Sequence, residues 1–138
     1  MDKIEVIINA PASKVWKAIS EKEQISEWLM PVEDFLLEPG NVSHMTFKGE
    51  GFTVKHTYTI KEIDKEKKLI LLWQVENFAG DTFITYELEE SGARTKLTFS
   101  LKGWEGAAFE SNEQSREEDI KAWKEVIQNV LKNYIEKS

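Results

Sequence analysis

Hydrophobic and polar residues alternate along several short segments of the chain, which is the pattern of half-buried β-strands. The alternation is strictest from Phe52 to Ile60, where His56, Tyr58 and Ile60 share one face and lysines and threonines occupy the other. Segments rich in apolar and β-branched residues predict six further strands. These are Lys3–Asn9, Phe35–Leu37, Val42–Phe47, Leu69–Val75, Thr82–Glu89 and Thr95–Leu101.

Each of the later strands also has one predominantly apolar face. Trp73 falls on the apolar face of Leu69–Val75, Tyr86 on that of Thr82–Glu89, and Phe99 on that of Thr95–Leu101. Only short turns separate these strands, and no crossover helix interrupts them. The sequence therefore predicts an antiparallel meander whose apolar faces form one continuous surface.

Two short helices are expected between the first strand and the rest of the sheet. Pro11 suits the start of a helix, because its missing N–H has no partner there in any case, and Val15, Trp16 and Ile19 give that helix an apolar face. A second short helix is anchored by three apolar residues before Pro31 ends it. These residues are Ile25, Trp28 and Leu29.

A long amphipathic helix is predicted at about residues 112–136. Its apolar residues follow the i, i+3, i+4, i+7 spacing of a single helix face, and polar residues cover the opposite side. The apolar stripe consists of Ile120, Trp123, Ile127, Val130, Leu131 and Tyr134, widened by Val126 and Ile135. A face this wide needs a concave partner, which a strongly twisted sheet provides. We therefore expect one α+β domain spanning residues 1–138, with this helix packed on the sheet.

Composition and charge narrow the classes of function. The chain has 138 residues, a net charge of −7 and no cysteine. The absence of cysteine excludes disulfides and thiolate metal sites, and the acidic balance argues against nucleic acid as a partner. The longest purely apolar run, Leu69 to Trp73, is far shorter than the roughly 20 residues that span a bilayer. With no signal peptide in the opening residues, we expect a cytoplasmic protein without integral membrane association.

Aromatic content indicates a ligand-binding cavity between the sheet and the long helix. The sequence contains fifteen aromatic residues, five of them tryptophan, and so many large rings are difficult to pack in a small domain without voids. Trp104, on the glycine-flanked stretch Gly103–Ser111, is expected near the mouth of the cavity. The predicted ligand-binding residues are Trp28, His56, Tyr58, Trp73, Tyr86, Phe99, Trp104, Trp123 and Ile127.

Polar groups on the inner face would orient such a ligand. A neutral His56 imidazole could hydrogen-bond a ligand carbonyl or act as a general base, or it could simply bond a neighbouring tyrosine. Buried hydroxyls of Tyr58 and Tyr86 need a partner, which could be a ligand, a water or His56. His44 and His56 lack metal-ligand spacing, and the signatures of nucleotide-binding and hydrolase sites are absent, so we expect neither metal nor cofactor.

Several short motifs, taken in order, resemble one superfamily. They are Ile8–Trp16, Trp28 at the end of the second helix, Ile84–Leu88, Thr95–Phe99, and Gly103-Trp104 before the last helix. Together they resemble the START/birch-pollen-allergen (SRPBCC) superfamily, and within it the family named after the activator of heat-shock-protein ATPase. The resemblance implies a helix-grip fold, in which a curved antiparallel sheet of six to seven strands surrounds the C-terminal helix. Many relatives carry a histidine where this chain has Leu101.

These observations leave three hypotheses of function. We expect a small-molecule binding protein rather than an enzyme, with an apolar or amphipathic ligand such as a lipid, an aromatic metabolite or a polyketide. The resemblance also implies a co-chaperone module that activates a chaperone ATPase. A cyclase or dehydratase using His56 and Tyr86 is the third hypothesis. Because one fold hosts many functions, the geometry of the site must decide among them.

Overall fold

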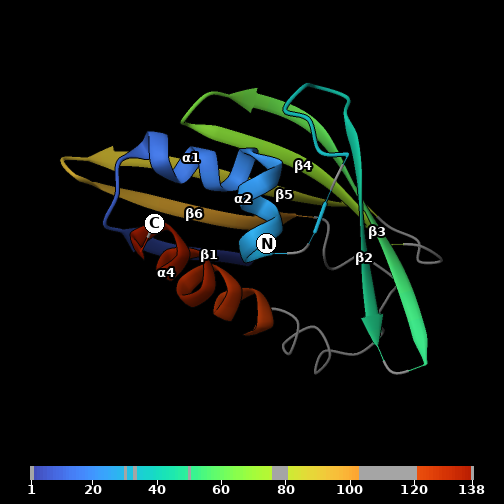
Figure 1. The fold of residues 1–138 in the computed structure, drawn as a ribbon. Coiled ribbons are helices and arrows are strands. Elements are labelled where there is room, and N and C mark those ends of the chain that lie inside the picture. Colours follow the sequence, from blue (N-terminus) through green and yellow to red (C-terminus); the bar gives the residue numbers. More distant parts are fainter. Residues whose placement is uncertain are drawn as a thin grey trace.

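The computed structural model describes residues 2–29, 31–32, 34–49, 51–75, 81–102 and 121–137. Strands β1 to β6 form one antiparallel sheet, and the helices formed by the described residues lie on one of its faces (Figure 1). The elements are β1 (Asp2–Ile8), α1 (Ala12–Ser20), α2 (Lys22–Trp28), β2 (Val42–Gly49), β3 (Phe52–Asp64), β4 (Lys68–Val75), β5 (Thr82–Ser91), β6 (Arg94–Lys102), a helical segment at 121–125, the π-helical η2 (Val126–Leu131) and α4 (Lys132–Lys137).

The strand order in the sheet is β1-β6-β5-β4-β3-β2. Strands β2 to β6 form the expected meander. The last strand, β6, pairs with the first, β1, which forms the edge of the sheet opposite β2. The hairpin between β5 and β6 is tight, because Ser91 pairs with Arg94 and only two residues lie between them. Gly92 adopts a φ of 63°, which glycine reaches without the steric cost that a side chain would add.

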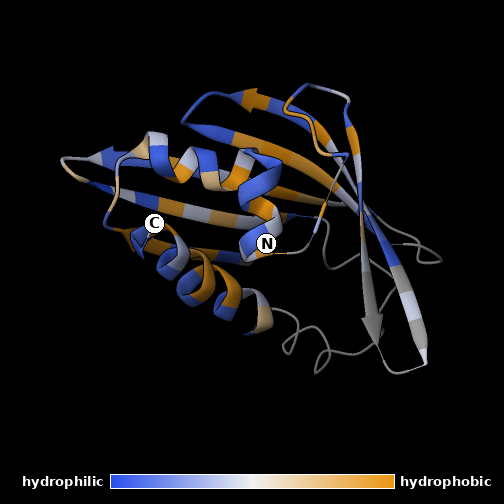
Figure 2. Cartoon of the chain, in the orientation of Figure 1, coloured by the Kyte–Doolittle hydropathy of each residue, from blue (hydrophilic) through white to orange (hydrophobic). Residues whose placement is uncertain are grey.

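Cross-strand pairing places the large inner-face residues next to one another. Tyr58 on β3 lies opposite Trp73 on β4, and Tyr86 on β5 lies opposite Phe99 on β6. Directly opposed residues of an antiparallel pair project from the same face of the sheet. The alternation in the sequence thus gathers its aromatic residues on one surface, and the colouring of Figure 2 shows the same alternation along the strands.

An irregularity in β3 changes which residues face inward. Ile60 lies opposite Leu71, but the pairing then shifts, so that Ile63 lies opposite Leu69. One extra residue in a strand reverses the face of every residue after it and increases the local twist. This bulge helps the sheet to curve, and Figure 1 shows β2 and β3 running steeply across the direction of β1 and β6.

The C-terminal helix, residues 121–137, packs along the inner face beside β1. Ile127, Leu131 and Ile135 are each no more than 1% exposed, and the Gln128 amide donates to the Glu5 carbonyl. Val130 is 41% exposed, although the stripe of apolar residues predicted it to face the sheet. The π-helical turn explains the difference. Its i→i+5 bonds widen the turn and carry Val130 away from the line of Ile127.

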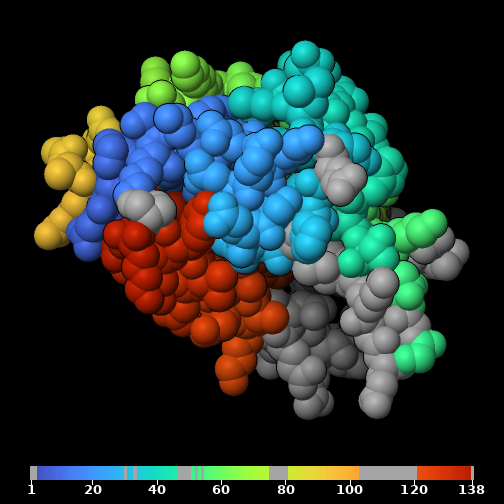
Figure 3. All heavy atoms as spheres, in the orientation of Figure 1, coloured from blue at the N-terminus to red at the C-terminus, as the bar shows by residue number. Residues whose placement is uncertain are grey.

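The helices on this face also contact one another. The Trp28 indole N–H donates to the Ala18 carbonyl at 2.7 Å and fixes α2 against α1. At the exposed edge the Tyr134 hydroxyl lies 3.4 Å from a Glu27 carboxylate oxygen. In Figure 3 the surface of α1 and α2 and that of the C-terminal helix adjoin one another. Together these helices cover the inner face of the sheet.

The predicted strand Phe35–Leu37 is wrong. These residues are irregular, with Phe35 buried and Leu36 exposed. Pairing with the sheet is found after this segment, where the Gly40 amide donates to the Ile60 carbonyl and the Ile60 amide donates to the Asn41 carbonyl. The segment therefore buries one aromatic ring without forming a ladder, which is why a short apolar run is a weak sign of a strand. The first part of the predicted long helix, residues 112–120, lies outside the described residues.

Adjacent isoleucines on β1 provide a test of this arrangement. Ile8 is fully buried, whereas Ile7 on the opposite face is 49% exposed. We expect Ile8→Ala to lower the free energy of unfolding by about 2–5 kcal/mol, because it removes buried methyl groups and leaves a cavity. The matched variant Ile7→Ala should change it by no more than about 0.5 kcal/mol. Urea unfolding measures both, and equal losses would show that the faces of β1 are assigned incorrectly.

Candidate functional site

A continuous cluster of aromatic rings covers the middle of the inner face. The Trp73 ring stacks with the Tyr58 ring at a centroid distance of 6.4 Å and meets the Trp123 ring edge-on at 5.8 Å. The Phe99 ring contacts Trp123 at 4.9 Å and Tyr86 at 5.4 Å. These distances lie within the range of favourable aromatic pairs. Trp123 therefore links the C-terminal helix to both β4 and β6.

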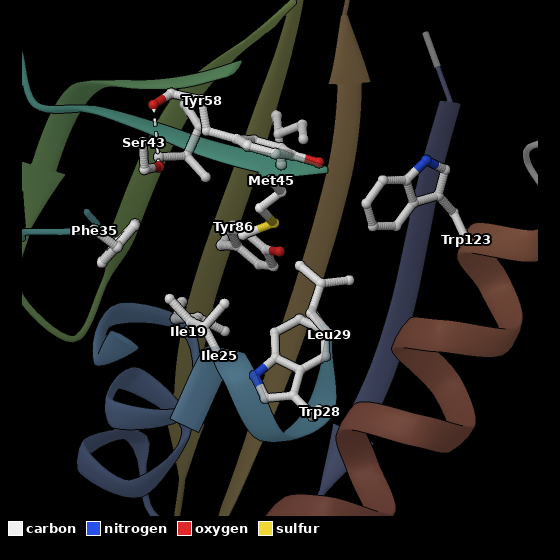
Figure 4. Close-up of a pocket in the computed structure, with 12 residues that line it drawn as sticks. Ile19, Ile25, Trp28, Leu29, Phe35, Ser43, Met45, Tyr58, Tyr86 and Trp123 are labelled. Carbon is white, nitrogen blue, oxygen red and sulfur yellow. Dashed lines mark hydrogen bonds between the residues drawn. The ribbon is translucent and has the colours of Figure 1, made fainter. Parts of the chain in front are cut away.

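A small cavity lies beside this aromatic cluster, between the sheet and the helices (Figure 4). Its volume is about 20 Å³, which is room for about one water molecule. Sites for small molecules usually measure about 300–1,000 Å³, so this cavity, as the described residues enclose it, is smaller than the expected ligand-sized space. Its twelve lining residues are Ile19, Ile25, Trp28, Leu29, Phe35, Ser43, Met45, Tyr58, Leu71, Ile84, Tyr86 and Trp123.

The lining residues differ in exposure, which locates the least covered part of the wall. Ten of the twelve are buried, and only Leu29 and Trp123 are half-buried. Leu29 directly follows α2, and Trp123 lies on the C-terminal helix across the cavity from α2 (Figure 4). Among the described lining residues, these two side chains are therefore the most exposed part of the wall.

His56 occupies a distinct position next to the aromatic cluster. The Trp73 indole N–H donates to His56 Nδ1 at 2.8 Å, and the two rings are stacked at 5.6 Å. Because Nδ1 accepts this bond, the neutral ring carries its proton on Nε2. Burial lowers the pKa of His56 to about 4, since the cationic form loses hydration inside the protein. His56 is thus a neutral imidazole near pH 7, fixed in orientation by Trp73.

Two tyrosines present hydroxyls to the cavity. Tyr58 and Tyr86 are each 4% exposed, and Figure 4 shows both hydroxyls directed into the space between the sheet and Trp123. Burial raises the pKa of both phenols far above the ordinary value, and negative charge on Tyr86 would raise the pKa of Tyr58 further. Both groups therefore remain neutral and can donate as well as accept a hydrogen bond.

The predicted ligand-binding residues divide into three groups in the structure. Trp28, Tyr58, Tyr86 and Trp123 line the cavity. Trp73 and Phe99 do not line it but contact the Trp123 ring, and His56 lies beside Trp73. Ile127 is fully buried where η2 packs near β1. Trp104 and the loop Gly103–Ser111 lie outside the described residues. His56 is not among the residues that line the cavity together with Tyr86.

Sequence reasoning did not select several of the lining residues. Ser43 and Met45 come from β2, which was identified as a strand without a choice of its inner face. The register supplies the missing signal, since Met45 lies opposite His56 and Ser43 opposite Tyr58. Phe35 was assigned to a strand of the sheet. Its buried ring instead closes the cavity from the irregular segment.

Neither a metal site nor a membrane span is found in the part of the chain that the structure describes. Its His, Asp and Glu side chains form no group of three or more that could hold an ion. Its helices are likewise too short or too polar to cross a bilayer. The site among these residues therefore consists of aromatic, aliphatic and hydroxyl groups.

This fold and inner-face site define a helix-grip protein of the START/birch-pollen-allergen-like (SRPBCC) superfamily. The family described as activator of Hsp90 ATPase homolog 1-like protein matches residues 9–136, and the chain belongs to this family. A search of curated proteins finds no significant match.

Solved structures of similar proteins have the same fold at low sequence identity. Protein CV1439 from Chromobacterium violaceum is 16% identical with a TM-score of 0.83, and the match covers 98% of this chain and 96% of that one. The Mll3558 protein from Rhizobium loti is 18% identical with a TM-score of 0.82, covering 96% and 94%. CalU16 from Micromonospora echinospora is 21% identical with a TM-score of 0.73, covering 96% and 74%.

The Trp73–His56 pair predicts a specific dependence of stability on pH. The pKa of His56 is about 4 in the folded protein and about 6.5 when the chain is unfolded, so the unfolded state binds the proton first. The contribution of His56 is complete above pH 6.5 and is lost as the pH falls toward 4. We expect His56→Phe to reduce this part of the acid destabilisation, as measured by urea unfolding at pH 7 and pH 5.

An NMR titration tests the same assignment directly. In the His44→Gln variant only one histidine remains, and its imidazole shifts should titrate near pH 4, with the neutral form protonated on Nε2. A midpoint near 6.5, or a proton on Nδ1, would contradict the assigned hydrogen bond from Trp73.

Proposed function

We propose that this protein binds an apolar or amphipathic small molecule between the inner face of the sheet and the C-terminal helix. The observation that carries the proposal is the continuous aromatic surface from Tyr58 to Phe99. In the described part of the C-terminal helix, Trp123 supplies the ring that contacts this surface. The adjoining cavity has walls made mostly of hydrocarbon and aromatic groups. Such walls bind apolar ligands by removing their surface from water.

The lining contains few polar side chains, and some of them are already bonded to the protein backbone. The Trp28 indole N–H already donates to Ala18, and the Ser43 hydroxyl lies 3.3 Å from the Tyr58 carbonyl oxygen. The two tyrosine hydroxyls are directed into the cavity, whereas Figure 4 shows the indole nitrogen of Trp123 on the side of its ring that is turned away from them. A mostly apolar pocket with a small number of placed polar groups is the usual composition of a small-molecule site, in which the polar groups set the orientation of the ligand.

Binding requires the cavity to enlarge, and the exposure of the lining indicates where. The sheet side is built from cross-strand pairs and is buried throughout, whereas Leu29 and Trp123 are half-buried. Leu29 follows α2, and Trp123 lies on the C-terminal helix. Separation of these two side chains opens the space without breaking the sheet. The ligand then replaces the contacts that Trp123 makes with Trp73 and Phe99, so that its burial offsets the cost of opening.

Membership of the family supports one alternative, a co-chaperone that stimulates Hsp90. That function would use an external surface, whereas the site described above is internal. We expect the protein to leave the rate of ATP hydrolysis by purified Hsp90 unchanged in a coupled assay. A saturable stimulation that survives a mutation blocking the cavity would instead favour the co-chaperone function.

A blocking mutation at the mouth tests the binding function. We expect neutral 1-N-phenylnaphthylamine to bind saturably, with a blue shift of its emission as it leaves water. Leu29→Trp adds bulk between α2 and Trp123 and should weaken this binding at least about fivefold, given packing costs of about 1–3 kcal/mol in a tight site. Ile7→Trp is the matched control, because Ile7 is exposed on the outer face of β1.

Fluorescence titration of the three proteins decides the question. Equal affinity in the wild-type, Leu29→Trp and Ile7→Trp proteins would place the probe outside the cavity. No saturable binding by the wild-type protein of this or any similar apolar probe would overturn the proposed function.

A further inference from the structure

Two buried hydroxyl groups in the cavity have no hydrogen-bond partner within the described part of the chain. They belong to Tyr58 on β3 and Tyr86 on β5, which share the inner face of the sheet with β4 between them. Each side chain is 4% exposed, so bulk water does not reach it freely. His56, a candidate partner, accepts the Trp73 indole N–H at Nδ1 and is not part of this lining.

Several other buried polar side chains in the described part of the chain have hydrogen-bond partners within the protein. The Ser20 hydroxyl donates to the Trp16 carbonyl at 2.6 Å, and the Thr95 hydroxyl donates to the Ala10 carbonyl at 2.8 Å. Trp28 likewise has a carbonyl partner. Burial of a polar group without a partner is costly, and most buried groups in proteins are satisfied. Two unpartnered phenols pointing into one cavity therefore indicate a polar atom that binds between them.

The cavity provides space for such an atom. Its volume of about 20 Å³ is enough for one water molecule, and a buried water needs two or more polar partners. A carbonyl oxygen can also bond to two polar partners, because its two lone pairs can accept two hydrogen bonds. Two phenol donors that line one small cavity can together supply the two hydrogen bonds that such an oxygen accepts.

We propose that Tyr58 and Tyr86 together bind the uncharged carbonyl oxygen of an otherwise apolar, preferably aromatic, ligand. The inference rests on the proposed function and names its ligand class. Without a ligand, one water occupies the position between the hydroxyls. Entry of the ligand displaces this water and brings the carbonyl group to the same place, while the rings of Trp28 and Trp123 contact the apolar frame.

The charge of the lining selects against acids. None of the twelve lining residues is Lys, Arg, His, Asp or Glu, so the described part of the chain places no cation in the lining that could compensate a buried carboxylate. Burial holds both phenols in their neutral form. An isolated charge in such a site loses its hydration without an opposite charge to replace it. A ketone, quinone, ester or amide therefore fits this cavity, and a carboxylate of the same shape does not.

Three naphthalene probes of similar shape test this ligand class. They are 2-acetylnaphthalene with a neutral carbonyl, 2-isopropylnaphthalene without an oxygen, and 2-naphthoate with a charge. Binding of each is measured by Trp fluorescence in the wild-type protein and in the Tyr58→Phe/Tyr86→Phe double variant. Each neutral hydrogen bond typically contributes a factor of about 2–12 in affinity, so the double variant should bind the ketone about tenfold or more weakly.

The hydrocarbon serves as the matched control, because it cannot use the hydroxyls. Its affinity should be unchanged or improved in the double variant, so that the loss is specific to the ketone. The ¹³C=O stretch of labelled 2-acetylnaphthalene should also lie lower in the wild-type complex than in the double variant. Naphthoate should bind at least tenfold more weakly than the ketone to the wild-type protein.

The possible outcomes separate this inference from the function on which it rests. If all three probes bind the wild-type protein but the double variant binds the ketone equally well, the protein is a binding protein and the role of the hydroxyls is wrong. Naphthoate binding as tight as ketone binding would overturn the preference for neutral ligands. If no probe binds saturably, both the proposed function and this ligand class fail.

Stability in the absence of ligand gives an independent readout. Tyr58→Phe and Tyr86→Phe should leave the melting temperature unchanged or raise it, because each removes a buried hydroxyl without a protein partner. Thr95→Val removes a buried hydroxyl that has one, and it should lower the melting temperature. Equal losses in all three variants would show that the tyrosine hydroxyls are already paired within the protein, which would contradict the inference.

Discussion

Docking of the C-terminal helix on the sheet is the contact on which the site depends, and within residues 121–137 the most deeply buried side chains lie from Ile127 onward. Ile127, Leu131 and Ile135 are completely buried, and the Asn9 amide donates to the Glu136 carboxylate at 2.8 Å. At the start of the described part of the helix, the half-buried ring of Trp123 contacts Trp73 and Phe99. The buried isoleucine and leucine side chains thus fix the helix on the sheet, and Trp123 connects it to the aromatic cluster beside the cavity.

The approximate positions of the six strands and the inner faces of β3 to β6 could be predicted from the sequence because they depend on local alternation. His56, Tyr58, Trp73, Tyr86 and Phe99 share one surface in the structure, as the period of two requires. Features set by tertiary packing could not be predicted in this way. The shift in β3 after Ile60 and the π-helical turn that exposes Val130 leave no mark on the hydrophobic pattern, because each adjusts one element to its neighbour.

The candidate site shows the same division. Alternation identified Tyr58 and Tyr86 as inward-facing, and the apolar face of α2 identified Trp28, but the volume enclosed between them depends on how closely two helices approach the sheet. The contacts between side chains could not be predicted from the sequence either. Nothing in the sequence indicates that the Trp73 indole would bond His56, or that Phe35 would close the cavity from an irregular segment. These outcomes depend on distances between elements far apart in the chain.

The protonation properties of the site favour recognition over catalysis. A general acid or base works best when its pKa lies near the pH at which the enzyme operates. Burial moves the pKa of His56 down to about 4 and raises the pKa of Tyr58 and Tyr86 well above their ordinary values, so all three are neutral and hold their protons firmly near pH 7. His56 is also not among the described residues that line the cavity with Tyr58 and Tyr86. Neutral groups with fixed orientation donate hydrogen bonds without exchanging protons, and a binding site for an uncharged molecule requires this property.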